Sequence, residues 1–172
     1  MNSPTTTPTR PLASTSTITF RAPEVTDGGA LWMLARGAGE LDVNTSYAYL
    51  LWARDFARTS LIAESGGVAT GFVSGYLRPE DPQTLMIWQV AVDPGFRGQG
   101  IARRMLHELT DRVGEASAME TTITDDNTAS IGLFTRFAGE RDAAIDQREL
   151  FGRGHFPDAH SAERLYRIAP LH

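Results

Sequence analysis

Residues 97–102, Arg-Gly-Gln-Gly-Ile-Ala, have the composition of an anion-binding loop, and they follow an apolar run and a Pro-Gly pair. Gly98 and Gly100 have no Cβ atom, so a ligand can approach the backbone closely. If a helix starts directly after the loop, its first N–H groups and the positive end of its dipole attract a phosphate, and Arg97 adds a fixed charge. We therefore predict a phosphate site here. A tight turn that only packs a helix on a sheet is the alternative interpretation.

The elements on both sides of the loop follow from hydrophobic periodicity. Residues 85–92 are apolar and β-branched enough to predict a strand. From residue 101 onward, apolar residues recur at helical spacing with charged residues opposite, which predicts an amphipathic helix packed on a sheet. Its apolar side consists of Ile101, Ala102, Met105, Leu106, Leu109 and Val113.

The rest of the chain alternates between strand and helix patterns, which indicates an α/β architecture. We expect strands at 18–21, 60–63, 68–77, 119–124 and 165–168, with a hairpin turn at Gly66 and Gly67. We expect one helix capped by Thr26 or Asp27 and ended by Gly37 and Gly39, and a second that starts at Thr45 or Ser46. A further helix is expected to be capped by residues 125–128 and closed by Gly139. Residues 78–84 are predicted to be a loop, and the remaining C-terminal part is irregular.

The order Arg97-x-x-Gly100-x-Ala102 after a Val-Ala-Val-Asp strand resembles the acetyl-CoA signature, Q/R-x-x-G-x-G/A, of the GNAT family of N-acetyltransferases. The resemblance implies a central mixed, mostly antiparallel sheet that splays at the acetyl-CoA site and is flanked by helices. It also implies acetyl-CoA as cosubstrate, with its pyrophosphate on the loop and its pantetheine arm along the strand edge. The cofactor-binding residues it implies are Val90, Ala91, Val92, Arg97, Gly98, Gln99, Gly100, Ile101, Ala102, Asn127 and Phe134.

The resemblance further implies direct attack of an amine on the thioester, with no acetyl-enzyme. A backbone N–H near Val90 to Val92 would stabilise the developing oxyanion. Asn127 can equally be a helix cap. Many relatives place a tyrosine on the following helix as general acid, where this chain has Leu133 and Phe134. Phe134 cannot give a proton, so another donor serves or the thiolate leaves unassisted.

Segments 41–47, 87–92 and 155–163 together resemble the branch of the family that acetylates L-2,4-diaminobutyrate for ectoine biosynthesis. The implied reaction is acetyl transfer to the 4-amino group. A diamino acid carries two ammonium groups, so Asp42 and Glu163 are predicted to bind them, with Trp88 as a flat wall and Tyr47 as a hydroxyl donor. Each residue also has a purely structural interpretation. Asp42 can cap a turn, Tyr47 and Trp88 can be core aromatics, and Glu163 can be a solvated charge.

The attacking amine must lose its proton, and we predict that Glu163 or Asp42 accepts it directly or through water. Arg54, Arg58 and Arg153 are candidates for the substrate carboxylate. His155, Asp158, His160 and Glu163 have metal-ligand chemistry, but they lie in an irregular loop. We expect no metal there and predict that residues 155–163 form a lid over the substrate.

Composition narrows the class of protein. The length of 172 residues fits one domain at 18–172 after a disordered tail at 1–17. The chain has no cysteine and a net charge of −5. The acidic balance argues against nucleic-acid binding, and no segment is apolar enough for a membrane span or signal peptide. We expect a cytoplasmic protein, and the resemblance implies a homodimer.

Two alternatives remain open. The chain could acetylate a polyamine, another small amine or a protein amino terminus. Because the usual tyrosine is absent, it could also be a non-catalytic acyl-CoA sensor.

Overall fold

The fold is built on one sheet of seven strands in the order β1-β2-β3-β4-β5-β7-β6. The computed structural model describes residues 17–39 and 41–171, so nearly all of the predicted tail lies outside the described residues. The β4–β5 pair is parallel and every other pair is antiparallel, as predicted for the fold class. The strands are β1 (Ile18–Arg21), β2 (Leu61–Ser65), β3 (Val68–Arg78), β4 (Asp81–Val92), β5 (Ala118–Thr124), β6 (Ala144–Phe151) and β7 (Glu163–Ala169).

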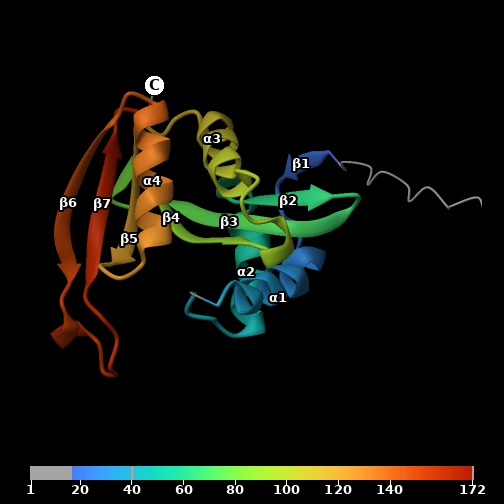
Figure 1. The fold of residues 1–172 in the computed structure, drawn as a ribbon, viewed down its shortest axis with the longest axis horizontal. Helices are drawn as coiled ribbons and strands as arrows, with labels where there is room; N and C mark the ends of the chain where they lie inside the picture. The colour runs from blue at the N-terminus through green and yellow to red at the C-terminus, as the bar shows by residue number, and fades with distance from the viewer. Residues whose placement is uncertain (1–16, 40, 172) are drawn as a thin grey trace, which may run out of the picture.

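Helices cover both faces of this sheet, α1 and α2 on one face and α3 and α4 on the other (Figure 1). Each pair buries its apolar side chains against the sheet, which gives two hydrophobic clusters. Within the described part of the chain, none of the helices combines the length and the apolarity that a membrane span requires. The helices are α1 (Gly28–Ala38), α2 (Ser46–Asp55), α3 (Ile101–Val113) and α4 (Thr128–Glu140).

The predicted hairpin and the predicted amphipathic helix are confirmed. Gly66 and Gly67 join β2 to β3 with φ values of 58° and 79°, a conformation that favours glycine. α3 has the expected bounds, and five side chains on its apolar face are almost completely buried. They are Ile101, Met105, Leu106, Leu109 and Val113.

The predicted loop at 78–84 is wrong. β3 continues to Arg78 and β4 begins at Asp81, so only residues 79–80 form the turn. Pro82 is tolerated inside β4 because pairing with β5 starts only at Thr84, so that side of β4 has no strand neighbour at the proline.

The C-terminal part is more regular than predicted, because β6 forms the edge of the sheet. Most of its side chains are exposed, so its sequence lacks the alternation that marks a half-buried strand.

Gly37 and Gly139 do not end their helices, which continue to Ala38 and Glu140. On α2 the core-facing residues are Tyr49 and Ala53.

Replacing Phe137, a fully buried side chain of α4, tests the packing between α4 and the sheet. We expect Phe137→Ala to lower the free energy of unfolding by about 3–5 kcal/mol, because it leaves a cavity in the larger cluster. The control Phe151→Ala removes a ring of the same size that is 45% exposed, and its effect should be far smaller. Urea denaturation measures both, and equal losses would contradict this packing.

Candidate active site

β4 and β5 separate in the middle of the sheet. They are paired only from Thr84 to Ile87 on β4 and from Ala118 to Thr121 on β5. Beyond Ile87, the edge of β4 that faces β5 has no strand partner, so its N–H and C=O groups are available to a ligand. This is the predicted splay, and residues Val90 to Val92 lie along it.

A β-bulge at Trp88 marks the point of separation. On β3, Ser74 pairs with Gln89 and Gly75 pairs with Ile87, so Trp88 is the extra residue. A bulge redirects the side chains that follow it. Ile87 therefore packs in the α3–α4 cluster, whereas Ala91 packs in the α1–α2 cluster.

The predicted phosphate loop opens directly onto α3. Gly98 and Gly100 have φ values of 77° and 71°, so both adopt the left-handed conformation that favours glycine. Gly100 is the N-cap of α3 and supplies no side-chain cap. The N–H groups of the first helical turn are thus left to a ligand. Arg97 Nη2 donates to the Ala38 carbonyl oxygen at 2.8 Å, which ties the loop to the end of α1.

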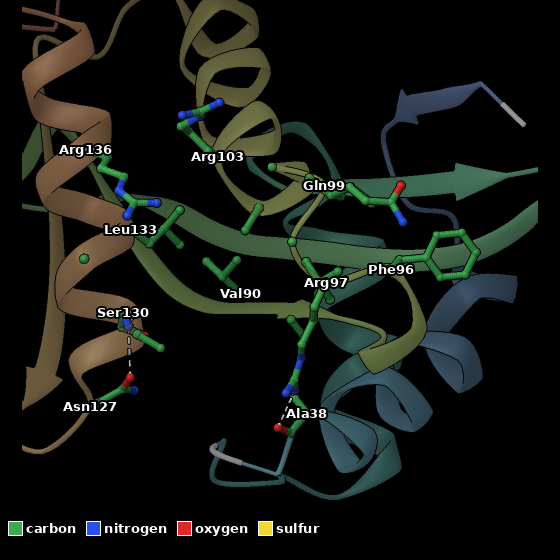
Figure 2. Close-up of a pocket in the computed structure, with 18 of the residues that line it drawn as sticks. Ala38, Val90, Phe96, Arg97, Gln99, Arg103, Asn127, Ser130, Leu133 and Arg136 are labelled. Carbon is green, nitrogen blue, oxygen red and sulfur yellow. Dashed lines mark hydrogen bonds between the residues drawn. The ribbon is translucent and has the colours of Figure 1, made fainter. Parts of the chain in front are cut away.

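A cleft of about 890 Å³ lies over this loop, between β4, α3 and α4; we call it the first cleft (Figure 2). Its lining includes every predicted cofactor residue except Phe134. Those lining residues are Val90, Ala91, Val92, Arg97, Gly98, Gln99, Gly100, Ile101, Ala102 and Asn127. Ten of the eleven predicted cofactor residues are therefore brought together on one surface.

Asn127 fits both of its interpretations, whereas Phe134 departs from the prediction. The Asn127 side chain accepts a hydrogen bond from the Ser130 N–H at 3.0 Å, so it caps α4, and it also lines the first cleft. Phe134 is 3% exposed and does not line the first cleft. It lies instead at the wall of a second cavity, because α4 turns this side chain toward the sheet.

The second cavity, of about 270 Å³, adjoins the first cleft. Four residues line both spaces: Leu41, Val90, Asn127 and Ser130. Three of the four predicted substrate residues, Asp42, Trp88 and Glu163, also line the second cavity. Among its described lining residues there are two carboxylates and no lysine or arginine, which favours a cationic ligand.

His160 bridges the two carboxylates. Its Nε2 lies 2.9 Å from Asp42 Oδ2 and 3.7 Å from Glu163 Oε1. Its Nδ1 lies 2.6 Å from the Ser161 carbonyl oxygen, which can only accept, so Nδ1 carries a proton. That backbone hydrogen bond, and next the one with Asp42, raise the pKa of His160. The arrangement favours an imidazolium between two anions.

Glu163 is the more enclosed carboxylate. Burial raises the pKa of its carboxyl group above the ordinary value, and its Oε2 has no hydrogen-bond partner among the described residues. The Asp42 side chain is 89% exposed, so it stands at the mouth of the second cavity. A carboxylate with a raised pKa and a free oxygen is suited to accept a proton.

Neighbouring side chains hold this cluster in place. Gln89 Nε2 donates to the Asp42 carbonyl oxygen at 2.9 Å, which fixes the loop between α1 and α2. Phe156 stacks on the His160 ring with centroids 4.3 Å apart. Trp88 packs against Trp52 of α2, with ring centroids 3.9 Å apart. This wall of the second cavity is therefore fixed by contacts from α2, β4 and the β6–β7 loop.

Several predicted residues are not brought to either cavity. Tyr47 is 64% exposed on α2 and lines neither space. Arg54 and Arg58 form ion pairs with Asp55 and Glu115, and Arg153 also lies outside both linings. Among the described residues, no group of three or more metal-ligating side chains converges.

Sequence reasoning missed two contributors. His160 is predicted as part of a lid and is weighed as a metal ligand, but its pairing with Asp42 spans 118 positions, which no local pattern reveals. Gln89 is a polar residue inside an apolar strand, and it is only 5% exposed. That interruption of the apolar run was the available signal.

The first cleft fits an acyl-CoA. It offers unpaired amides for the diphosphate and an open strand edge for the amide groups of pantetheine. The thioester end then reaches the residues shared with the second cavity. Such an arrangement places an activated acyl group beside an acidic pocket, which is the geometry for acyl transfer to an amine.

The comparisons with known proteins agree with this geometry. The profile described as "Acetyltransferase (GNAT) family" matches residues 30–139. The chain belongs to this family, as the loop signature predicted.

Particular relatives are more informative. The chain is 49% identical to an L-2,4-diaminobutyric acid acetyltransferase of Nocardia farcinica, over 90% of this chain and 81% of that protein. It is 51% identical to one of Streptomyces coelicolor, over 87% of this chain and 91% of the other. A solved structure similar to it is the diaminobutyrate acetyltransferase of Paenibacillus lautus in complex with its substrate L-2,4-diaminobutyric acid and coenzyme A. The TM-score is 0.87 at 37% identity, covering 91% of this chain and 97% of that one.

The contact of His160 with Asp42 predicts a pH-dependent contribution to stability. Because the folded-state pKa of His160 is raised, the contribution is fully present below the ordinary histidine pKa and is lost as pH rises through the raised value. His160→Gln should therefore destabilise the fold more at about pH 6 than at about pH 9. Urea unfolding at both pH values measures the difference.

The matched control is His155→Gln, in the same loop, because His155 forms no ion pair with the described residues. Its effect should not follow this pH pattern. An equal effect of His160→Gln at the two pH values would contradict an ionised contact.

Proposed function

We propose that this protein transfers the acetyl group of acetyl-CoA to the 4-amino group of L-2,4-diaminobutyrate. The observation that carries the proposal is the junction of the two cavities at Leu41, Val90, Asn127 and Ser130. The named relatives support the choice of substrate, since about half of the aligned residues are identical to those of this chain. The Paenibacillus lautus complex supports a common site for the diamino acid and coenzyme A.

The cavities divide the work of binding. Residues 97–102 hold the diphosphate, and the free edge of β4 at Val90 to Val92 orients the pantetheine arm. A backbone N–H on that edge stabilises the oxyanion that develops on the thioester carbonyl. Acetyl-CoA supplies the activated acetyl group. No residue of the chain is acylated, so the reaction is one direct displacement.

The acidic cavity prepares the amine. Asp42 and Glu163 attract the two ammonium groups, and Trp88 gives a flat wall that also favours a cation. Glu163 accepts the proton of the reacting amine, because burial brings its pKa closer to that of the amine. The amine nitrogen adds to the thioester carbon, and collapse of the resulting oxyanion then breaks the carbon–sulfur bond. The second proton on that nitrogen passes to the departing thiolate through solvent, which gives the amide and free coenzyme A. The thiolate leaves without a tyrosine acid, and its modest basicity permits this.

His160 positions the acidic pair. It links the β6–β7 loop to the loop between α1 and α2 through Asp42, and it lies beside Glu163. This contact supports the proposal that residues 155–163 form a lid over bound substrate. It also keeps both carboxylates close to the amine.

We further propose that the protein acts as a homodimer in the cytoplasm, without a metal, membrane or nucleic-acid partner. Apolar side chains exposed around the start of α2 support an interface there: Val43 is 44%, Tyr47 is 64% and Leu50 is 40% exposed. The chain's net charge of −5 is unsuited to phosphate backbones.

Competition between amines tests the substrate. With acetyl-CoA and equal amounts of diaminobutyrate, ornithine, lysine and spermidine, we expect acetylation mainly of diaminobutyrate, because the similar proteins described above are named for this substrate. Mass spectrometry identifies the products. Preference for spermidine or for a peptide amino terminus would reassign the substrate, and no thiol release with any amine would indicate an acyl-CoA sensor.

Replacing Glu163 tests the proton acceptor. Glu163→Gln should lower kcat by about 10²- to 10⁴-fold, because a carboxamide accepts no proton from the amine. The affinity for coenzyme A should stay within about twofold, since Glu163 does not line the first cleft. The matched control is Glu149→Gln on the neighbouring strand β6, which lines neither cavity. An unchanged kcat in Glu163→Gln would remove this residue from the mechanism.

A further inference from the structure

Among the lining residues that the structure describes, arginine is the only charged residue type in the first cleft. Arg97, Arg103 and Arg136 face it, and no aspartate or glutamate stands among its described lining residues, although the chain carries a net charge of −5. Local charge of one sign in an oppositely charged protein concentrates ligands of the other sign. The cleft therefore offers more positive charge than the loop amides alone provide.

Two of these arginines are not needed at the phosphate loop. Arg97 already donates to the Ala38 carbonyl oxygen, and the amides of residues 98–102 serve the diphosphate. Arg103 extends from the first turn of α3 and Arg136 from the middle of α4, on opposite sides of the cleft (Figure 2). Among the described residues, Arg136 forms no ion pair within 4.0 Å, unlike Arg103.

Glu140 pairs with Arg103 and lies on the same helix as Arg136. Its Oε1 lies 2.9 Å from Arg103 Nη1, and Arg136 is one helical turn before it on α4. The pKa of the Glu140 carboxyl is lowered chiefly by its hydrogen bond with His107, and the charges of Arg103 and Arg136 both add to this. Both arginines line the first cleft, and Figure 2 shows them at the same end of it, so an anion at that end can meet both.

The direction of the cleft indicates which anion this is. Asn127 and Ser130, shared with the second cavity, mark the end where the thioester must lie. Arg136 lies further along α4, and Figure 2 shows it apart from Asn127, on the side of Arg103. The part of an acyl-CoA that lies away from its thioester is the nucleotide, and it carries a phosphate monoester on the ribose.

We propose that Arg103 and Arg136 bind the 3′-phosphate of coenzyme A and make the protein select coenzyme A over dephospho-coenzyme A. This proposal rests on the proposed function only in so far as the first cleft binds acetyl-CoA. A terminal dianionic phosphate presents three oxygens, and two guanidinium forks match them with charge-assisted hydrogen bonds.

Calorimetric titration with coenzyme A and with dephospho-coenzyme A tests this without any amine substrate. We expect the wild-type protein to bind coenzyme A at least about tenfold more tightly. Arg136→Ala and Arg103→Ala should each weaken the binding of coenzyme A and leave that of dephospho-coenzyme A unchanged. The matched control is Arg104→Ala, which removes the next arginine of α3; its guanidinium lies over the Phe20 ring, outside the cleft.

The outcomes separate the proposals. Equal affinity of the wild-type protein for the two ligands would overturn the 3′-phosphate site. Equal weakening of both ligands by Arg136→Ala would also overturn it, because the arginine would then serve the diphosphate or the position of α4. If the tenfold preference is found but no acetyl group reaches diaminobutyrate, the phosphate site stands and the proposed substrate fails.

Discussion

β4 and β5 share hydrogen bonds only as far as Ile87 and Thr121, and both cavities occupy the space beyond that point. The bulge at Trp88 coincides with the separation and turns Gln89 toward the loop that carries Asp42. An unpaired strand edge inside a protein is costly unless another group satisfies it. The fold keeps this edge for a ligand backbone, and α3 and α4 stand beside it without closing it.

The first cleft and the second cavity are lined by side chains of opposite charge. The first cleft is lined by arginines and by helix-start amides, whereas the second cavity has Asp42 and Glu163. A polyanion and a small dication are therefore drawn to neighbouring places by opposite fields. His160 prevents the two carboxylates from simply repelling each other, because its ring lies between them.

The parts of the fold that the sequence predicted are those with local rules. The loop at 97–102 and the apolar side of α3 follow from glycine chemistry and from a 3.6-residue period, and the structure places them as expected. β6 was not predicted, because an exposed edge strand has no alternating pattern of buried and exposed residues. A loop was predicted after Arg78 because a proline usually interrupts a strand. Pro82 is compatible with β4 because β5 does not pair with β4 at that position.

Long-range contacts account for the rest of the site. Asp42 and Glu163 were predicted from a resemblance, yet their link through His160 depends on how two distant loops meet. Tyr47 fits the same predicted set, but the helical phase of α2 turns it outward, since Tyr49 and Ala53 take the core positions. Residues 47–53 of α2 are all apolar or aromatic, so its sequence does not show which side of the helix faces the core.

The wall shared by the two cavities has a thermodynamic consequence. Leu41, Val90, Asn127 and Ser130 contact whatever occupies either space. Any rearrangement of these four residues by one ligand changes the free energy with which the other binds, and linkage requires the same factor in both directions. The binding affinities of the acyl donor and of the amine acceptor are therefore coupled through these few side chains, and no distant regulatory site is needed.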